Sequence, residues 1–378
     1  MEWHRRQSRI SLRTHRAVAL LRRSVIPLLI QVEAMSILRP IVATLTLAAW
    51  CATPASAQGA LIVLSKSDAQ ASIVDIATGR IVRTYPTGDG PHEVAVSPDG
   101  RTAVVGNYGG QTPGSSLTVI DLTGRVAPRL IALGEYRRPH GMVWLRDGRR
   151  LLVTAEVNRA LLVVDVAAGR VDQAIATGQD LSHMVALGPD ERMAYTANIG
   201  SGSVTRIDLA ASVASQSVVT GTGPEAIDVL PNGREVWAAD RNLDRITILS
   251  ADRLDSLGSL ATLRFPNRLK FTVDGARALV SNATAGAITV YDVARRALIS
   301  TIVIAFDPAK KRAEAVLGDM GSSAVPLGIV MEPNGKRAWV ATAALGEVVE
   351  IDLATLTVSR TIRAGNNPDG MAYIPRLP

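Results

Sequence analysis

Cysteine is nearly absent from this chain of 378 residues, which contains only Cys51. A single cysteine forms no internal disulfide and offers no cysteine cluster to a metal ion. Aromatic residues are also scarce, at 4% of the sequence, so small aliphatic side chains must fill the interior. The apolar content of 47% is nevertheless sufficient for a large core, and a chain of this length can fold without disulfides.

Beyond the N-terminal segment, the sequence also lacks an excess of charge of either sign. The formal net charge is +7, but residues 1–57 contain eight arginines and two acidic residues, which account for +6. The remainder contains 33 basic and 32 acidic residues and is therefore close to neutral. A near-neutral chain does not favour nucleic acid as a partner.

Residues 35–57 have the pattern of a secretory signal peptide. Arg39 supplies the positive charge, Ile41–Cys51 the apolar stretch, and Ala55-Ser56-Ala57 the cleavage site, so we expect the mature chain to begin at Gln58. This stretch and every later apolar run are shorter than the roughly 20 residues of a membrane-spanning helix, so we expect no transmembrane anchor. The predicted location is periplasmic or secreted. Residues 1–34 are interpreted as an over-extended gene start before Met35 or, alternatively, as a long n-region.

One phrase recurs through residues 58–378: an apolar strand, then Pro-Asp-Gly or a relative, then a second apolar strand. The central Asp or Asn of this phrase falls at regular positions, namely 99, 147, 190, 232, 274 and 334. The steps between them are 48, 43, 42, 42 and 60 residues. A period in the forties, with Asx-Gly turns between short strands, is typical of a β-propeller with one four-stranded blade per period.

One period is clearest at residues 139–178, where four strands are expected over 139–145, 150–155, 160–166 and 171–176. Seven such first strands can be aligned, and the last is Pro368–Ile374. Residues 60–88 already hold the second, third and fourth strands of a unit. The sequence therefore predicts an all-β, seven-bladed propeller whose ring closes by splitting one blade between the ends, three strands from the N-terminus and one from the C-terminus. This closure removes two free sheet edges.

These repeats resemble those of the YVTN-repeat β-propeller family over residues 60–376. The motifs that carry the resemblance are Tyr195-Thr196-Ala197-Asn198, Val119-Ile120-Asp121-Leu122 and the run from Gly90-Pro91 to Pro98-Asp99-Gly100. The resemblance implies the propeller fold. It leaves the function open, because the family includes surface proteins, periplasmic proteins, lactonase-like enzymes and subunits of quinone-linked dehydrogenases.

Polar residues gather at one position of the repeat, the start of the first strand, which lines the channel of a propeller. Three histidines fall there in consecutive units, and acidic or amide residues fall there in others. The loops that follow the second strands open on the same face and carry further polar residues. The candidate ligand-binding face comprises His92, His140, His183, Glu225, Asn267 and Asp369 from the first strands, with Glu156 and Asp240 from the loops. Two irregular segments, 108–116 and 305–325, are expected to be binding loops on this face.

Three histidines beside a carboxylate are the ligand chemistry of Zn²⁺ or Cu²⁺, so His92, His140 and His183 form a candidate metal site. An open fourth position would make such a site catalytic, with Glu225 as a candidate base. The simpler interpretation is that these side chains only hydrate the channel mouth. Metal binding would require the three ring nitrogens to converge, because metal–nitrogen bonds are about 2.0–2.1 Å long.

The favoured hypothesis is an exported, monomeric propeller that binds a small ligand or a periplasmic protein through this histidine-rich face. The first alternative is a metal-dependent enzyme of the lactonase or oxidoreductase type. The second is an accessory subunit of a quinone-linked periplasmic dehydrogenase, whose partner chain would supply the cofactor.

Overall fold

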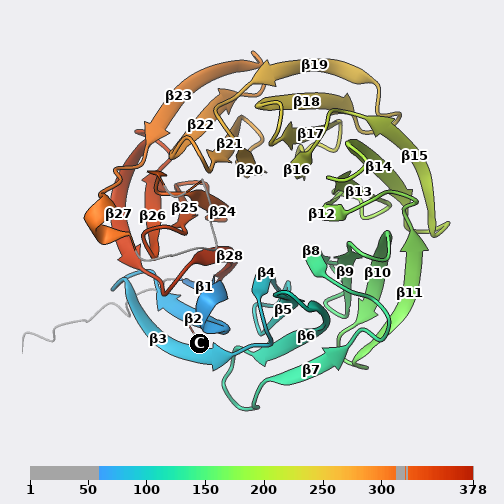
Figure 1. The fold of residues 1–378 in the computed structure, drawn as a ribbon, viewed down its shortest axis with the longest axis horizontal. Coiled ribbons are helices and arrows are strands. Elements are labelled where there is room, and N and C mark those ends of the chain that lie inside the picture. Colours follow the sequence, from blue (N-terminus) through green and yellow to red (C-terminus); the bar gives the residue numbers. More distant parts are fainter. Residues whose placement is uncertain (1–58, 312–319, 321, 378) are drawn as a thin grey trace, which may run out of the picture. The chain divides into compact units, whose positions relative to one another are not determined.

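Seven four-stranded antiparallel sheets surround a central channel in the computed structural model, which describes residues 59–311, 320 and 322–377 (Figure 1). The fold is a seven-bladed β-propeller, as the sequence period predicted. Six blades are continuous in the chain, and we number them 1 to 6 from the blade that contains Pro91; the blade shared by the two ends is blade 7.

The strands fall into four rows, from the channel outward. The inner row contains β4 (Pro91–Val96), β8 (Pro139–Trp144), β12 (Ser182–Leu187), β16 (Pro224–Val229), β20 (Pro266–Phe271), β24 (Pro326–Met331) and β28 (Pro368–Ile374). The second row contains β5 (Thr102–Gly109), β9 (Arg150–Ala155), β13 (Met193–Asn198), β17 (Glu235–Asp240), β21 (Arg277–Asn282), β25 (Arg337–Thr342) and β1 (Ala60–Ser65).

The third row contains β6 (Pro113–Asp121), β10 (Ala160–Asp165), β14 (Ser203–Asp208), β18 (Arg245–Ser250), β22 (Ala287–Asp292), β26 (Glu347–Asp352) and β2 (Gln70–Asp75). The outer row contains β7 (Arg129–Ala132), β11 (Arg170–Ala176), β15 (Val213–Val219), β19 (Ser256–Ala261), β23 (Ala297–Val303), β27 (Thr357–Arg363) and β3 (Arg80–Pro86). Two short 3₁₀ helices, η1 (Lys66–Asp68) and η2 (Pro308–Lys310), lie in connections.

Blade 7 closes the ring with strands from both ends of the chain. Its strand order is β28-β1-β2-β3, and β1 pairs antiparallel with β28 from Ala60 opposite Ile374 to Ser65 opposite Pro368. The predicted split of three N-terminal strands and one C-terminal strand is confirmed. Both edges of β1 are thereby paired, which leaves no unpaired strand at the point of closure.

The recurring Pro-Asp-Gly phrase forms the turn between the inner and second strands. In blade 1 the Asp99 carboxylate accepts hydrogen bonds from the Ser97 hydroxyl at 2.6 Å and from the Arg101 backbone N–H at 3.0 Å. Gly100 follows at φ 73°, in the left-handed region that suits glycine. Because the same turn returns in each continuous blade, every inner strand starts on one face of the propeller and ends on the other.

The space between blades is filled mainly by buried aliphatic residues, with few large rings. Alternate residues of each strand face the two neighbouring blades, so both faces of a sheet are covered. Trp237 and Trp339 are fully buried exceptions. Among the described residues no helix is long and apolar enough to cross a membrane. The predicted signal peptide, residues 35–57, and the preceding residues 1–34 lie outside the described part of the chain. Residues 312–319 and 321 of the predicted binding loop 305–325 also lie outside it.

Candidate functional site

The second residue of each inner strand contributes to one ring of side chains at the channel mouth. In all seven blades the pairing of the inner and second strands is interrupted by a β-bulge at this step. A bulge redirects the side chain and releases it from strict alternation. This inner ring consists, in order, of His92, His140, His183, Glu225, Asn267, Leu327 and Asp369.

A second set of seven residues lies at the ends of the second strands or directly after them, at the same face. Each of them donates its backbone N–H to the carbonyl of the residue that precedes an inner strand. This upper ring consists of Lys66, Tyr108, Glu156, Ile199, Arg241, Ala283 and Ala343. Glu156 therefore lies one step further along the repeat than Asp240, although both were predicted from the loops that follow the second strands. The row of Asp240 also contains Asn107, Asn198 and Asn282.

The residues in the row of Asp240 stabilise the blades themselves. Asp240 is the clearest case, because its two oxygens accept the backbone N–H groups of Thr222 at 2.6 Å, Gly223 and Asn242 at 2.9 Å, and Leu243 at 3.0 Å. Its carboxylate is thus occupied by loop backbone. The structure does not place Asp240 with the inner ring residues, although it was predicted as part of the binding face.

His183 lies between two buried carboxylates, one from each ring. Its Nδ1 is 2.5 Å from Oε1 of Glu156, and its Nε2 is 3.1 Å from Oε1 of Glu225. Burial alone would lower the pKa of His183, but the charges and hydrogen bonds of Glu225 and Glu156 outweigh it and raise this pKa to about 9. His183 is therefore an imidazolium at neutral pH that donates a hydrogen bond from each nitrogen.

Glu225 is saturated with donors. Besides His183, it accepts a hydrogen bond from Nδ2 of Asn267 at 3.0 Å and one from Nη1 of Arg241 at 2.7 Å. Burial raises its pKa, but His183, Arg268 and Arg241 outweigh this effect and hold the pKa well below its usual range. A carboxylate with so low a proton affinity is a poor general base, so the geometry does not favour the predicted catalytic role of Glu225.

Tyr108 extends over the mouth from the end of β5, where the lengthened hairpin to β6 begins. Its hydroxyl donates to Oε2 of Glu156 at 2.6 Å, and its ring contacts those of His92 and His140, with centres 4.9 Å and 5.5 Å away. The guanidinium carbon of Arg138 lies 4.5 Å from the centre of the Tyr108 ring, above its face. The predicted binding loop at 108–116 thus contributes a side chain directly to the site.

Lys66 and Asp369 fix the protonation of His92. The Lys66 ammonium donates to Oδ2 of Asp369 at 3.2 Å and lies 3.3 Å from Nε2 of His92. Because an ammonium can only donate, Nε2 of His92 is an acceptor and the proton is on Nδ1. Burial, followed by the charge of Lys66, lowers the pKa of His92 well below its usual range, consistent with a neutral ring.

Below the rings, a charged pair crosses the channel. Arg268 of β20 donates to Oε1 of Glu93 in β4, from Nε at 3.1 Å and also from Nη2. Beside Glu93, the inner strands β28 and β4 approach so closely that a Cβ on Gly370 would lie 2.4 Å from the carbonyl oxygen of His92. An ion pair and closely packed inner strands therefore lie at the step after the inner ring.

Several buried polar atoms at the mouth have no partner among the described residues. They are both ring nitrogens of His140, Nδ1 of His92, Oδ1 of Asp369, and the side-chain oxygen and nitrogen of Asn367. His140 is fully buried, and burial lowers its pKa well below the usual range. Because a buried polar atom without a partner is costly, these atoms require water or a ligand.

The structure does not gather the three histidines around one metal position. Within the described chain, the grouped metal-ligand atoms belong to His140, Glu156 and His183, which lie within 4.8 Å of one another; His92 is not among them. Both nitrogens of His183 already bind carboxylates. The ring centres of His140 and His183 are 3.6 Å apart, too close for their nitrogens to bind one ion tetrahedrally at about 2.0–2.1 Å. This arrangement does not fit the predicted Zn²⁺ or Cu²⁺ site.

Sequence reasoning missed most of the residues that pair with the predicted ones, namely Lys66, Glu93, Arg241 and Arg268, whereas Tyr108 lay in a predicted binding loop. One signal was available for two of them. At the step after the inner ring, Glu93 and Arg268 are the charged members of a set otherwise made of Gly, Ala and Met. Opposite charges at a position that faces a channel predict a pair across it.

No family model and no curated protein sequence matches the chain. Solved structures with the same fold do match. One, titled Kuenenia stuttgartiensis hydrazine synthase, is 18% identical with a TM-score of 0.62, over 75% of this chain and 89% of that one. Another, a functionally unknown protein from Desulfotomaculum acetoxidans, is 14% identical with a TM-score of 0.67, over 84% and 99%. At these identities the similarity shows the fold alone.

Proposed function

We propose that this chain is an exported propeller of the YVTN-repeat type that binds a small polar ligand at the mouth of its channel. The observation that carries the proposal is His140, a fully buried ring with neither nitrogen paired within the described chain. The predicted signal peptide supports export, and the YVTN-like strands support the family.

The unpaired atoms define what the ligand must offer. Nδ1 of His92 is a donor, Oδ1 of Asp369 is an acceptor, and a neutral His140 provides one of each. A ligand with adjacent donors and acceptors, such as a hydroxyl-bearing small molecule, matches this set. The ion pair of Arg268 and Glu93 crosses the channel one step beyond the inner ring.

The test is a thermal-shift screen with sugars, polyols, amino acids and hydroxy acids on wild type and on His140→Phe. We expect a ligand that raises the melting temperature of the wild type and has no effect on the variant. Asp240→Asn is the matched control, because its carboxylate stabilises a neighbouring loop without reaching the inner ring. It should lower stability and leave the ligand-induced shift intact.

A screen in which no compound depends on His140 would contradict small-ligand binding. The second candidate is then an accessory role in a larger enzyme, for which the observation is the similarity to a propeller chain titled hydrazine synthase. Affinity purification from the native host would distinguish the two, because an accessory subunit copurifies with a redox partner in stoichiometric amount.

A further inference from the structure

The strongest departure from the repeat outside the channel lies on the opposite face, where β6 leads to β7. Seven residues, 122–128, connect these strands in blade 1. The same connection has five residues in blade 4 and four residues in each of the other five blades. The outer strand β7 has only four residues, whereas the other outer strands have six or seven. In a repeat protein, an insertion confined to one unit marks a candidate binding loop.

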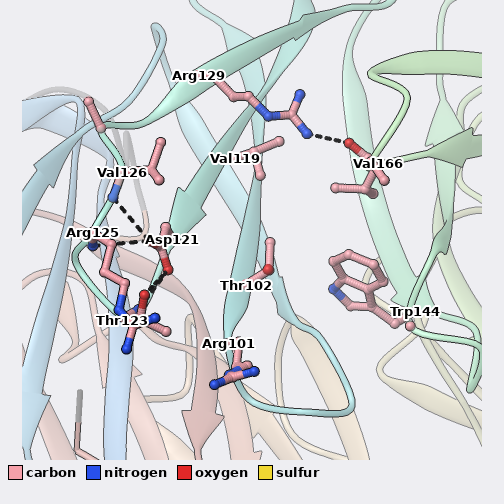
Figure 2. Close-up of a pocket in the computed structure, with 13 residues that line it drawn as sticks. Arg101, Thr102, Val119, Asp121, Thr123, Arg125, Val126, Arg129, Trp144 and Val166 are labelled. Carbon is pink, nitrogen blue, oxygen red and sulfur yellow. Dashed lines mark hydrogen bonds between the residues drawn. The ribbon is translucent and has the colours of Figure 1, made fainter.

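The inserted segment forms one wall of a groove between blades 1 and 2 with a volume of about 440 Å³. Arginines of blade 1, Arg101 and Arg125, lie along this wall, and Trp144 and Val166 of blade 2 line the facing wall (Figure 2). This volume lies within the range of small-molecule sites, roughly 300–1,000 Å³. The groove is remote from the inner ring, because it lies where the inner strands end.

The arginines in this groove are not neutralised by the acidic residue beside them. The Asp121 carboxylate accepts hydrogen bonds from the Thr123 hydroxyl at 2.6 Å and from three backbone N–H groups of the inserted segment at 2.8–3.0 Å. The guanidinium groups of Arg101 and Arg125 make no hydrogen bond or ion pair with any residue in the described ranges. Arg129, the third arginine, donates to the Val166 carbonyl across the groove.

Two other grooves on this face are balanced in charge, and a third, between blades 7 and 1, has Arg101 and Arg376 beside the single carboxylate of Asp99. The groove between blades 5 and 6 has two cations and two carboxylates in its walls, and so does the groove between blades 3 and 4. The groove between blades 1 and 2 has three arginines and one carboxylate. Since the repeat itself does not require this excess of positive charge, the excess indicates an anionic ligand.

An apolar surface adjoins the arginines. Val126, on the inserted segment, has 64% of its surface exposed, and Trp144 and Val119 form the deeper wall. We propose that this groove is a second binding site, which takes a small organic anion. The acid group pairs with Arg101 and Arg125, and the apolar body lies against Val126 and Trp144.

The experiment follows the indole N–H signal of Trp144 by NMR during titration of the purified protein with benzoate and phenyl phosphate. Benzyl alcohol, of similar shape and without charge, is the neutral control ligand. We expect both anions to bind, the alcohol to bind at least about tenfold more weakly, and added salt to weaken the anions. Arg101→Gln and Arg125→Gln should each weaken anion binding about tenfold or more.

Lys336→Gln is the matched control variant, because Lys336 follows the turn glycine of blade 6 as Arg101 follows that of blade 1, and it lines the balanced groove between blades 5 and 6. It should bind both anions as the wild type does. The proposal is overturned if neither anion binds, if benzyl alcohol binds as tightly as benzoate, or if the Arg101 and Lys336 variants behave alike. Binding that persists in His140→Phe separates this site from the one at the channel mouth.

Discussion

The rings of His140 and His183 lie in close, tilted contact, with centres 3.6 Å apart and planes inclined by 34°, yet they differ in protonation. His183 is held as a cation by the carboxylates of Glu156 and Glu225. Burial keeps the pKa of His140 low, and the neighbouring charge of His183 lowers it further. A neutral imidazole is thus in close contact with an imidazolium, and the neutral ring keeps one donor and one acceptor for a ligand.

The first prediction concerns stability at alkaline pH. The pKa of His183 is raised to about 9 in the folded protein, above the ordinary value near 6.5, so its stabilising contribution is present below pH 6.5 and is lost as the pH rises through 9. We expect the free energy of unfolding to fall by an amount on the order of 3 kcal/mol over this window. Urea unfolding at pH 6.5, 8 and 9.5 measures it.

His183→Gln should abolish most of this alkaline decline. In acid the trend reverses, because the lowered pKa values of His92 and His140 mean that the unfolded chain takes up protons that the folded protein does not. Stability of the wild type should therefore also fall below pH 6.5. The hypothesis that Glu156 and Glu225 hold His183 as an imidazolium would be contradicted by either of two results. One is a free energy of unfolding that stays constant from pH 6.5 to 9.5 in the wild type, and the other is the same alkaline decline in the His183→Gln variant.

The second prediction concerns Glu225→Gln. This change leaves His183, Arg241 and Arg268 without their shared counter-charge in a buried site, and the loss should be about 3–5 kcal/mol at neutral pH. The loss should be smaller at pH 9.5, where His183 is neutral. Glu347→Gln, at a half-buried position with no ion pair in the described structure, is the control and should change little. Equal losses in the two variants would contradict the role of Glu225.

The third prediction tests the close approach of the inner strands. A Cβ at Gly370 would lie 2.4 Å from the His92 carbonyl oxygen, which belongs to the backbone and cannot easily move. Gly370→Ala should therefore destabilise the protein by about 1–3 kcal/mol or more. Gly110→Ala is the control, since its nearest neighbour is the end of the Asp89 side chain at 3.4 Å. A harmless Gly370→Ala would show that the inner strands pack more loosely.

The sequence was sufficient to predict the blade count, the split closure and the membership of the inner ring. These features depend on local turns that return with a fixed period, so an alignment of the repeat transfers directly to space. Glu156 was misplaced by one residue. The repeats were aligned on the Pro-Asp-Gly turns, whereas the upper ring that contains Glu156 is defined by backbone hydrogen bonds to the inner strands. Asp240 looked like a site residue for the same reason.

The partners of the ring could not be derived in the same way. Arg268 and Glu93 are separated by 175 residues and meet only because the ring brings opposite blades together. The orientation of the histidine rings could not be derived from the sequence either. A metal site and a pair of rings in contact require the same residues at the same repeat positions. The β-bulges and the carboxylates around His183 decide between them.

The fourth prediction concerns the N-terminus of the mature protein. Expression of the full chain in a bacterium should yield a periplasmic or secreted product that starts at Gln58. Mass spectrometry of the intact protein measures this start. Ala57→Arg places a large charged side chain at the cleavage site and should leave the leader attached. A cytoplasmic product with an intact leader from the wild-type gene would contradict export.

The last prediction concerns zinc, the ion suggested by three histidines at one repeat position. Zn²⁺ would have to remove a proton from His183 and displace Glu156 or Glu225, and it would still lack His92 as a ligand. Isothermal titration at pH 7 should therefore show no stoichiometric binding that depends on His140. The control is His140→Ala under the same conditions. One Zn²⁺ per chain in the wild type and none in the variant would contradict the hydrogen-bonded arrangement of His183 between Glu156 and Glu225. It would restore the metal-enzyme hypothesis, because the rings of His140 and His183 must move apart before both can bind one ion.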